Sequence, residues 1–239
     1  MNPSRPDVVP PPLAPAASLG PFAGAAVDVV LPVWSDSDLL RRTLWSIRRT
    51  ADLPYSLIVS CARRSVAENR NAGLDRGRHD VTFFLDDDVL LPPHWMSRLL
   101  SVLARREDLG AVGPHLTFPN GAPQTRRPDL APGELWEVTI PGTVFVYSRR
   151  RVGDPRFDEA YLGSQWEDTD WMWQLRDRGF STALTGDVHV LHEHEAKENR
   201  WLEENMRTFH GKWGRLPAED DVVAITREAF DAWTPEPLP

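Results

Sequence analysis

The sequence predicts an α/β fold in which a mixed, mostly parallel sheet is flanked by helices. Apolar runs of strand length, such as 25–34 and 81–85, alternate with segments whose apolar residues recur at helical spacing. Strands that alternate with helices form right-handed βαβ units, and these place the strands in a largely parallel sheet. Ligands of such sheets bind at the carboxyl ends of the strands.

The first half of the chain is the more regular one. Pro32 ends the first apolar run, Ser35 to Ser37 can cap the helix that follows, and prolines open the third helix in its first turn. We expect strands at 25–34, 55–61, 81–85 and 109–118, and helices at 35–50, 65–77 and 92–108.

The second half predicts fewer regular elements. Residues 135–148 indicate one or two strands, split at Pro141-Gly142. A helix is expected at 167–178 and a last helix at 196–210. Between them, 181–195 is either a pair of strands or one strand and a loop.

Composition predicts one soluble globular domain, because 41% of the 239 residues are hydrophobic and 26% are charged. We expect a disordered Pro/Ala-rich arm at 1–24, a single domain at 25–233 and a tail at 234–239. A formal net charge of −8 argues against general binding to nucleic acid or to anionic membranes.

The same reasoning gives an expected compartment. Cys61 is the only cysteine, so the chain has no internal disulfide and no thiolate metal cluster. No apolar run approaches the ~20 residues of a transmembrane segment, and prolines interrupt any signal-peptide pattern at the start. A cytoplasmic protein is the expectation.

Three adjacent acids, Asp86 to Asp88, directly follow the strand expected at 81–85. Ionised carboxylates at such close spacing repel one another when they are buried. A hard divalent cation, Mg²⁺ or Mn²⁺, would offset that repulsion and could bridge the carboxylates to phosphates. The alternatives are a solvated acidic turn, or a phosphotransfer or phosphatase site with a nucleophilic aspartate.

Two later clusters strengthen the metal interpretation. Glu167, Asp168 and Asp170 begin a helix, where the macrodipole stabilises anions. His192 and His194 follow the late strand, and an imidazole beside carboxylates suits Mn²⁺ better than Ca²⁺. Each cluster also has an ordinary interpretation, because acids at helix starts and single surface histidines are common.

In their order along the chain, these segments resemble the metal-dependent glycosyltransferases of the GT-A fold, and family 2 in particular. The resemblance covers roughly 26–214 and is carried by "VDVVLPVW", "AENRNAGL", "FFLDDDV", "GTVFVYSRR", "FDEAYLGSQWEDTDWMWQLRDRGF", "HVLHEH" and "FHGKWG". It implies a nucleotide-binding half at about 25–120, an acceptor half at about 121–215 and a C-terminal segment at 216–233.

For the donor, the resemblance implies a nucleoside-diphosphate sugar, most simply of UDP or GDP type, bound with Mn²⁺ or Mg²⁺. Asp86 would contact the donor ribose, Asp88 would hold the metal on the diphosphate, and Asp87 would lie beside them. Three further residues are expected to border the nucleotide: Pro32, Trp34 and Arg70.

For the reaction, the resemblance implies that Asp168 is the general base for a hydroxyl acceptor and that Glu167 supports it. His192 would complete the metal shell, with His194 as the second candidate. Sugar transfer is expected to invert the anomeric centre, because the base approaches opposite the leaving group. Trp166 is the expected acceptor contact, since an indole face suits a sugar ring, whereas Trp171 is expected in the core.

The sequence also departs from many relatives. Its second strand ends in Ser60-Cys61 in place of an acid that reads the base, and Ser35 stands where asparagine is usual. The alternatives are a sugar-1-phosphate nucleotidylyltransferase, another phosphoryl-transfer enzyme, or an inactive carbohydrate-binding protein. The first lacks support because "LPVWSDSD" contains no glycine-rich loop.

Overall fold

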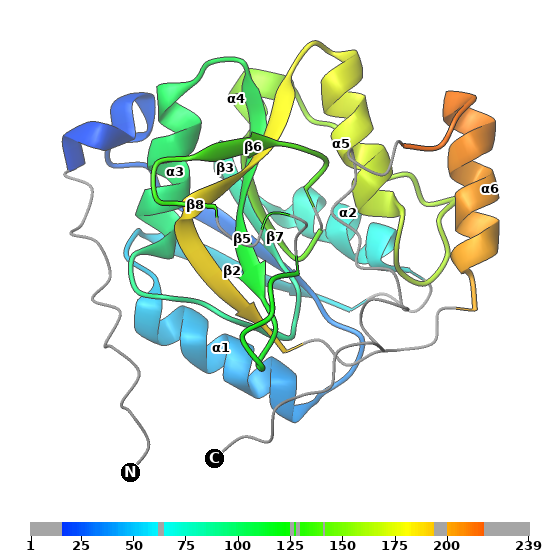
Figure 1. Ribbon diagram of the computed structural model, residues 1–239. Coiled ribbons are helices and arrows are strands. Elements are labelled where there is room, and N and C mark those ends of the chain that lie inside the picture. The colour runs from blue at the N-terminus through cyan, green and yellow to red at the C-terminus, as the bar shows by residue number, and fades with distance from the viewer. Residues whose placement is uncertain are drawn as a thin grey trace.

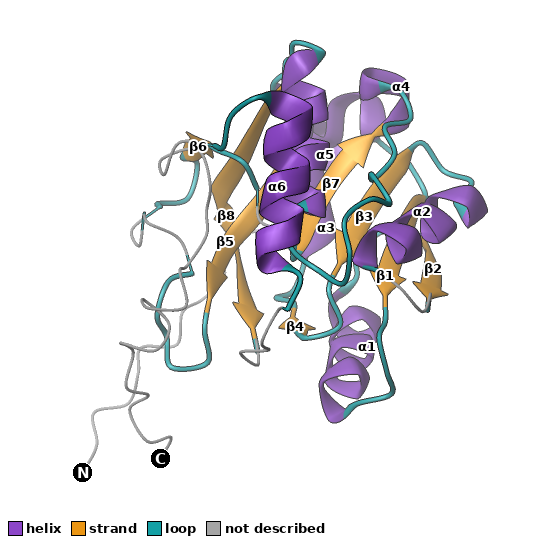
Figure 2. Cartoon of the chain, turned by 90° about the vertical axis from the view of Figure 1, so that its right-hand side faces the viewer, coloured by secondary structure: helices purple, strands orange, loops and turns teal. Residues whose placement is uncertain are grey.

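The structure, a computed structural model, describes residues 16–61, 65–124, 127, 130–140, 142–193 and 200–217. Its strands are β1 (Val27–Pro32), β2 (Tyr55–Ser60), β3 (Val81–Leu85), β4 (Val89–Leu90), β5 (Leu109–Thr117), β6 (Leu135–Glu137), β7 (Val144–Ser148) and β8 (Ser181–His192). These strands form one eight-stranded sheet in the order β2-β1-β3-β7-β5-β8-β4, with β6 paired to β8 (Figures 1 and 2).

The sheet is mixed and mostly parallel, as the sequence predicts. β1 is parallel to β2 and β3, and β5 is parallel to β8. β7 lies antiparallel between β3 and β5, so β1, β2, β3, β5 and β8 all point the same way. Their carboxyl ends therefore lie along one edge of the sheet, at the bottom of Figure 2.

Helices cover both faces of the sheet. They are α1 (Asp38–Thr50), α2 (Val66–Arg76), α3 (Trp95–Arg105), α4 (Arg149–Val152), α5 (Glu167–Asp177) and α6 (Leu202–Trp213), with a 3₁₀ segment η1 (Ala16–Phe22). Alternate strand residues face opposite layers: Val29 and Phe83 pack with α1, α3 and η1, whereas Val30 and Phe84 pack with α2 and α5. The core is thus split into two apolar layers by the sheet.

The helices begin where capping residues allow them to begin. The hydroxyl of Ser37 accepts a hydrogen bond from the backbone N–H of Leu40 at 3.0 Å, and Ser65 caps α2 in the same way through Glu68. The expected strands and helices of the first half are all present, with ends that differ by a few residues.

Three details differ from the sequence prediction, and one choice between two alternatives is decided. The expected arm at 1–24 is too long, because Leu19 and Phe22 are buried against the core and hold η1 in place. Of the two alternatives for 181–195, the structure has the single strand, β8, whose pairing with β5 shifts at Pro114/His115. The two-residue strand β4 was not expected, and the last helix begins at Leu202, not at 196.

Candidate functional site

The Asp86–Asp88 turn lies at the carboxyl edge of the sheet. β3 ends at Leu85, and the N–H of Asp86 donates to the carbonyl of Thr143 at 2.8 Å, just before β7. The chain then returns to the sheet in β4, so the turn is tied down on both sides. The predicted location of these acids at a strand end is confirmed.

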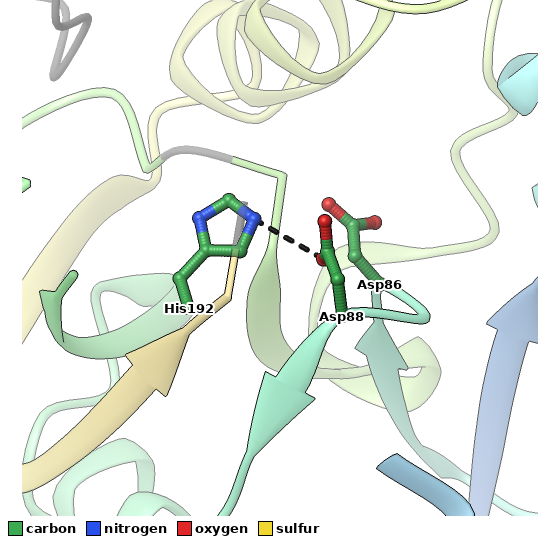
Figure 3. Close-up of side chains that lie close together, drawn as sticks. All are labelled: Asp86, Asp88 and His192. Atoms are coloured by element: carbon green, nitrogen blue, oxygen red, sulfur yellow. Dashed lines mark ion pairs between the residues drawn. The ribbon is translucent and has the colours of Figure 1, made fainter. Parts of the chain in front are cut away.

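Strand pairing brings Asp88 and His192 together. Val89 of β4 is in register with His192 at the end of β8, and the N–H of Glu193 donates to the carbonyl of Asp88 at 2.7 Å. As a result the Nε2 atom of His192 lies 3.1 Å from Oδ1 of Asp88 (Figure 3).

Gln124 orients the His192 ring. Its Oε1 lies 2.6 Å from Nδ1 of His192 and accepts the Nδ1–H bond. That bond leaves the lone pair on Nε2, the atom that points toward Asp88, and this is how an outer partner prepares an imidazole to bind metal. Gln124 could not be selected from the sequence, because it lies in the loop after β5.

Asp86, Asp88 and His192 fit a divalent cation. One possible ligand atom from each lies within 4.8 Å of the other two, and the three side chains converge in Figure 3. Two carboxylate oxygens and one imidazole nitrogen form a donor set that suits Mn²⁺, and Mg²⁺ when waters complete its shell. Asp87 is half-buried and is not part of this group.

Arg70, on α2, lies between the metal-binding acids and the acids of α5. Its guanidinium is buried and contacts both Oδ1 of Asp86 and Oε1 of Glu167 at 3.1 Å. The same group donates to the carbonyl of Gly142 at 2.6 Å. Arg70 therefore joins the two acidic clusters that lie far apart in the sequence.

Gly142 is the second link between the two clusters. Its N–H donates to Oδ2 of Asp168 at 2.6 Å, while its carbonyl accepts from Arg70. A Cβ atom on Gly142 would lie 2.7 Å from both Cβ and Oδ2 of Asp168 and 2.8 Å from Nη2 of Arg70. Only glycine leaves room for these two side chains. The sequence marked the Pro-Gly position as a break between strands and did not mark it as part of a site.

The two acids at the start of α5, Glu167 and Asp168, differ in how deeply they are buried. Burial raises the pKa of Glu167 to about 8, and the nearby charge of Asp168 adds to this, against the lowering effect of Arg70. The Oε2 atom of Glu167 has no hydrogen-bond partner among the described residues. Asp168 is less buried. Two adjacent acids with different environments can take different roles in one reaction.

Burial also acts on Asp86. It raises the pKa of Asp86 to about 6; the charges of Asp88 and Asp87 raise it further, whereas Arg70 and His192 lower it. The side chain nevertheless keeps 31% of its surface exposed. The carboxylate can therefore be approached by a cation, and a positive charge there would offset the repulsion among the acids.

The remaining predicted residues lie as follows. Pro32 ends β1 beside Ser60, and Trp34 follows it with 58% of its surface exposed, so both lie at the carboxyl edge of the sheet. Trp166 directly precedes Glu167, and its ring packs against Phe209 with centroids 5.2 Å apart. Trp171 is fully buried in the core, as expected, and His194 lies outside the described residues.

The fold and the site are similar to those of a known class of protein. The third strand of a mixed α/β sheet ends in an Asp-x-Asp turn, with a late histidine beside it and an acidic helix start opposite, which is the arrangement that the resemblance to GT-A glycosyltransferases implies. The description "Glycosyl transferase family 2" belongs to the family model that matches residues 57–150. Over that range the sequence is similar to family 2 glycosyltransferases, and the fold is similar to that of a GT-A glycosyltransferase, as the ordered segments predict.

Two known proteins illustrate the similarity. The Succinoglycan biosynthesis protein ExoM of Rhizobium meliloti (strain 1021) is 26% identical over 182 residues, which are 70% of this chain and 58% of ExoM. This chain therefore spans less than two thirds of that relative. The crystal structure of GalNAc-T7 with UDP, GalNAc and Mn²⁺ superposes with a TM-score of 0.57 at 12% identity, over 72% of this chain and 44% of GalNAc-T7. At that identity the similarity concerns the fold.

Among the described residues, no helix has both the length and the apolar character that a membrane span requires. The cytoplasmic location stays a prediction from sequence.

Proposed function

We propose that the protein transfers a sugar from a nucleoside-diphosphate donor to an acceptor hydroxyl, with a divalent metal and with inversion. The observation that carries this proposal is the convergence of Asp86, Asp88 and His192 beside Arg70, which in turn contacts the acidic start of α5. The metal-bound diphosphate would then lie at the Asp86–Asp88 turn, and the general base would lie across Arg70 at the start of α5.

Asp86, Asp88 and His192 would hold the metal, which when bound supplies positive charge to the diphosphate leaving group. Asp87, Pro32 and Trp34 are proposed to border the nucleotide from the same edge. The GalNAc-T7 crystal structure contains UDP and Mn²⁺, so UDP with Mn²⁺ is the first donor pair to test. Because ExoM is a succinoglycan biosynthesis protein, we propose a saccharide hydroxyl as the acceptor.

Asp168 is the proposed base. The acceptor oxygen forms a bond to the anomeric carbon, the bond from that carbon to the diphosphate oxygen breaks, and the acceptor proton passes to the Asp168 carboxylate. Hydrogen bonds from Gly142 N–H and Thr169 N–H hold the carboxylate, and each oxygen keeps a second lone pair for the proton. Glu167 supports this position through Arg70, and Trp166 is proposed to contact the acceptor.

Calorimetric titration with Mn²⁺ and UDP or GDP, followed by turnover of matching nucleotide sugars, tests the proposal. Wild type is expected to bind the metal-nucleotide pair, and Asp88→Ala to lose that binding. Asp168→Asn is expected to bind normally and to lose turnover by about 10²–10⁴-fold. Absence of metal-dependent nucleotide binding in wild type, or equal turnover in Asp168→Asn, would contradict the assignment.

A further inference from the structure

A left-handed loop leads into the Glu167–Asp168 pair. Gln165 and Trp166 have φ angles of 75° and 76°, a conformation that residues with a Cβ atom rarely adopt. Trp166 is also the N-cap residue of α5 and makes no side-chain capping hydrogen bond. Such backbone persists only where surrounding structure holds it, so contacts from outside the loop must determine how α5 begins.

Asn205, on α6, provides those contacts. Its side chain is fully buried, and its Nδ2 donates to the carbonyl oxygens of Leu162, Ser164 and Gln165 at 2.9, 3.2 and 3.0 Å. Its Oδ1 accepts from the N–H of Leu162 at 3.0 Å. One carboxamide therefore binds the loop backbone at both ends of the turn.

The helix that carries Asn205 is itself fastened to α5. The buried carboxylate of Asp170 accepts hydrogen bonds from Nζ of Lys212 and Nε1 of Trp213 at 2.9 and 2.8 Å. Phe209 packs against Trp166 and Trp173 with ring centroids 5.2 and 5.0 Å apart. Figures 1 and 2 show α6 lying against α5 on the side away from the sheet.

We propose that Asn205 is the positioning residue for the Asp168 base. By holding the 162–165 backbone it sets the left-handed entry into α5, and that entry aims Asp168 at Gly142 and toward the acceptor side. Asn205 acts through the loop and has no contact with the metal-binding residues in the described structure. The inference rests on the function proposed above, because it names what sets the geometry of that reaction.

The test compares Asn205→Ala with Thr208→Ala, which changes a neighbouring residue of α6 whose hydroxyl bonds within the helix. Mn²⁺ and UDP serve as the binding probe, and UDP release from a panel of UDP-sugars serves as the turnover assay. Hydrogen exchange of the 163–168 amides reports the loop without need of a substrate. Asn205→Ser, which keeps a hydroxyl donor, is the milder variant if Asn205→Ala does not fold.

We expect Asn205→Ala to lower kcat at least tenfold, while the donor KM and UDP–Mn²⁺ affinity stay within twofold of wild type. The 163–168 amides should exchange at least tenfold faster, with α3 unchanged, and Thr208→Ala should match wild type. The double variant Asn205→Ala/Asp168→Asn should be no slower than Asp168→Asn, because Asn205 acts through Asp168.

Unchanged exchange at 163–168, a kcat within twofold of wild type, or additive losses in the double variant would each overturn the inference. A wild type that binds no UDP–Mn²⁺ and turns over no nucleotide sugar would instead reject the proposed function. The exchange result would then still show whether Asn205 holds the loop, so the two failures are distinguishable.

Discussion

At the scale of single residues, the site depends on groups that have no acid–base chemistry of their own. Gly142 receives a hydrogen bond from Arg70 and donates one to Asp168, and its missing side chain lets both approach. Gln124 fixes the ring of His192. These two residues decide where charged groups point, although neither is charged.

Gly142→Ala tests this role directly. The added methyl group meets backbone-anchored Asp168 and buried Arg70 at under 3 Å, so one of them must move. We expect a loss of about 1–3 kcal/mol in the free energy of unfolding and a loss of turnover larger than stability alone explains. Urea unfolding and UDP-sugar turnover measure the two effects.

Gly211→Ala is the matched control, since nothing lies within 4 Å of a Cβ at Gly211 and the residue is an exposed part of α6. Alanine should stabilise that helix by about 0.5–1 kcal/mol. If Gly142→Ala and Gly211→Ala change the free energy of unfolding and the turnover alike, the close approach of Asp168 and Arg70 to Gly142 does not contribute to function.

Glu167 gives the molecule a predictable pH dependence. Its pKa is raised to about 8 in the folded state, chiefly by burial, so the folded protein binds a proton that the unfolded chain releases near pH 4.5. The stability that this group contributes is complete below about pH 4.5 and falls as the pH rises to about 8. The slope approaches about 1.4 kcal/mol per pH unit between these values.

Urea unfolding of wild type and Glu167→Gln at pH 5 to 9 measures this effect, because glutamine cannot titrate. The stability of wild type relative to the variant should decrease up to about pH 8 and then level off. A difference that stays constant over this range would show that Glu167 is ionised throughout.

At the scale of elements, α5 begins in a conformation that its own sequence does not favour. The left-handed φ of Gln165 costs free energy in any residue with a Cβ atom, and glycine lacks that cost. Gln165→Gly is therefore expected to raise the free energy of unfolding by about 1 kcal/mol.

Ser164→Gly provides the opposite case one residue away. Ser164 has no left-handed φ, so glycine there only adds freedom to the unfolded chain and should lower stability by about 0.5–1 kcal/mol. Equilibrium urea unfolding of both variants gives the comparison. The same sign of change in both would mean that the loop stores no local strain.

The elements also show how far sequence reasoning extends. The βαβ units of the first half were predictable because each strand, helix and cap is encoded within about thirty residues, as with Ser37 and Ser65. β4 was not predictable, because two residues become a strand only by pairing with β8. The left-handed start of α5 depends in the same way on Asn205, which comes later in the chain.

At the scale of the whole molecule, the fold gathers acids at one edge of the sheet. The sequence indicated that a late histidine could share a cation with these acids, and the resemblance favoured His192; the structure brings Asp86, Asp88 and His192 close together. Gln124 and Gly142 could not be predicted, because their parts depend on which loops meet across the sheet. The roles of the individual residues in catalysis stay predictions.

The gathered acids make the stability of the whole protein depend on metal and nucleotide. A ligand that binds only the folded state at a hundredfold excess over its Kd adds about 2.7 kcal/mol, or about 5–10 °C in Tm for a domain of this size. We expect Mn²⁺ with UDP to raise the Tm of wild type by this amount. Asp88→Asn should lose the shift.

Without metal, Asp88→Asn should melt at or above the wild-type temperature, because the substitution removes one of three neighbouring negative charges, and the side-chain N–H of asparagine can donate to the Nε2 lone pair of His192. Glu203→Gln, a change on the exposed face of α6, should keep the full shift. A thermal melt of the three proteins with EDTA, Mn²⁺ and Mn²⁺–UDP separates these outcomes. An equal Tm shift in wild type and Asp88→Asn would place the metal elsewhere. Only a site that includes Asp88 makes this one charge affect both the stability of the metal-free protein and the stabilisation by metal and nucleotide.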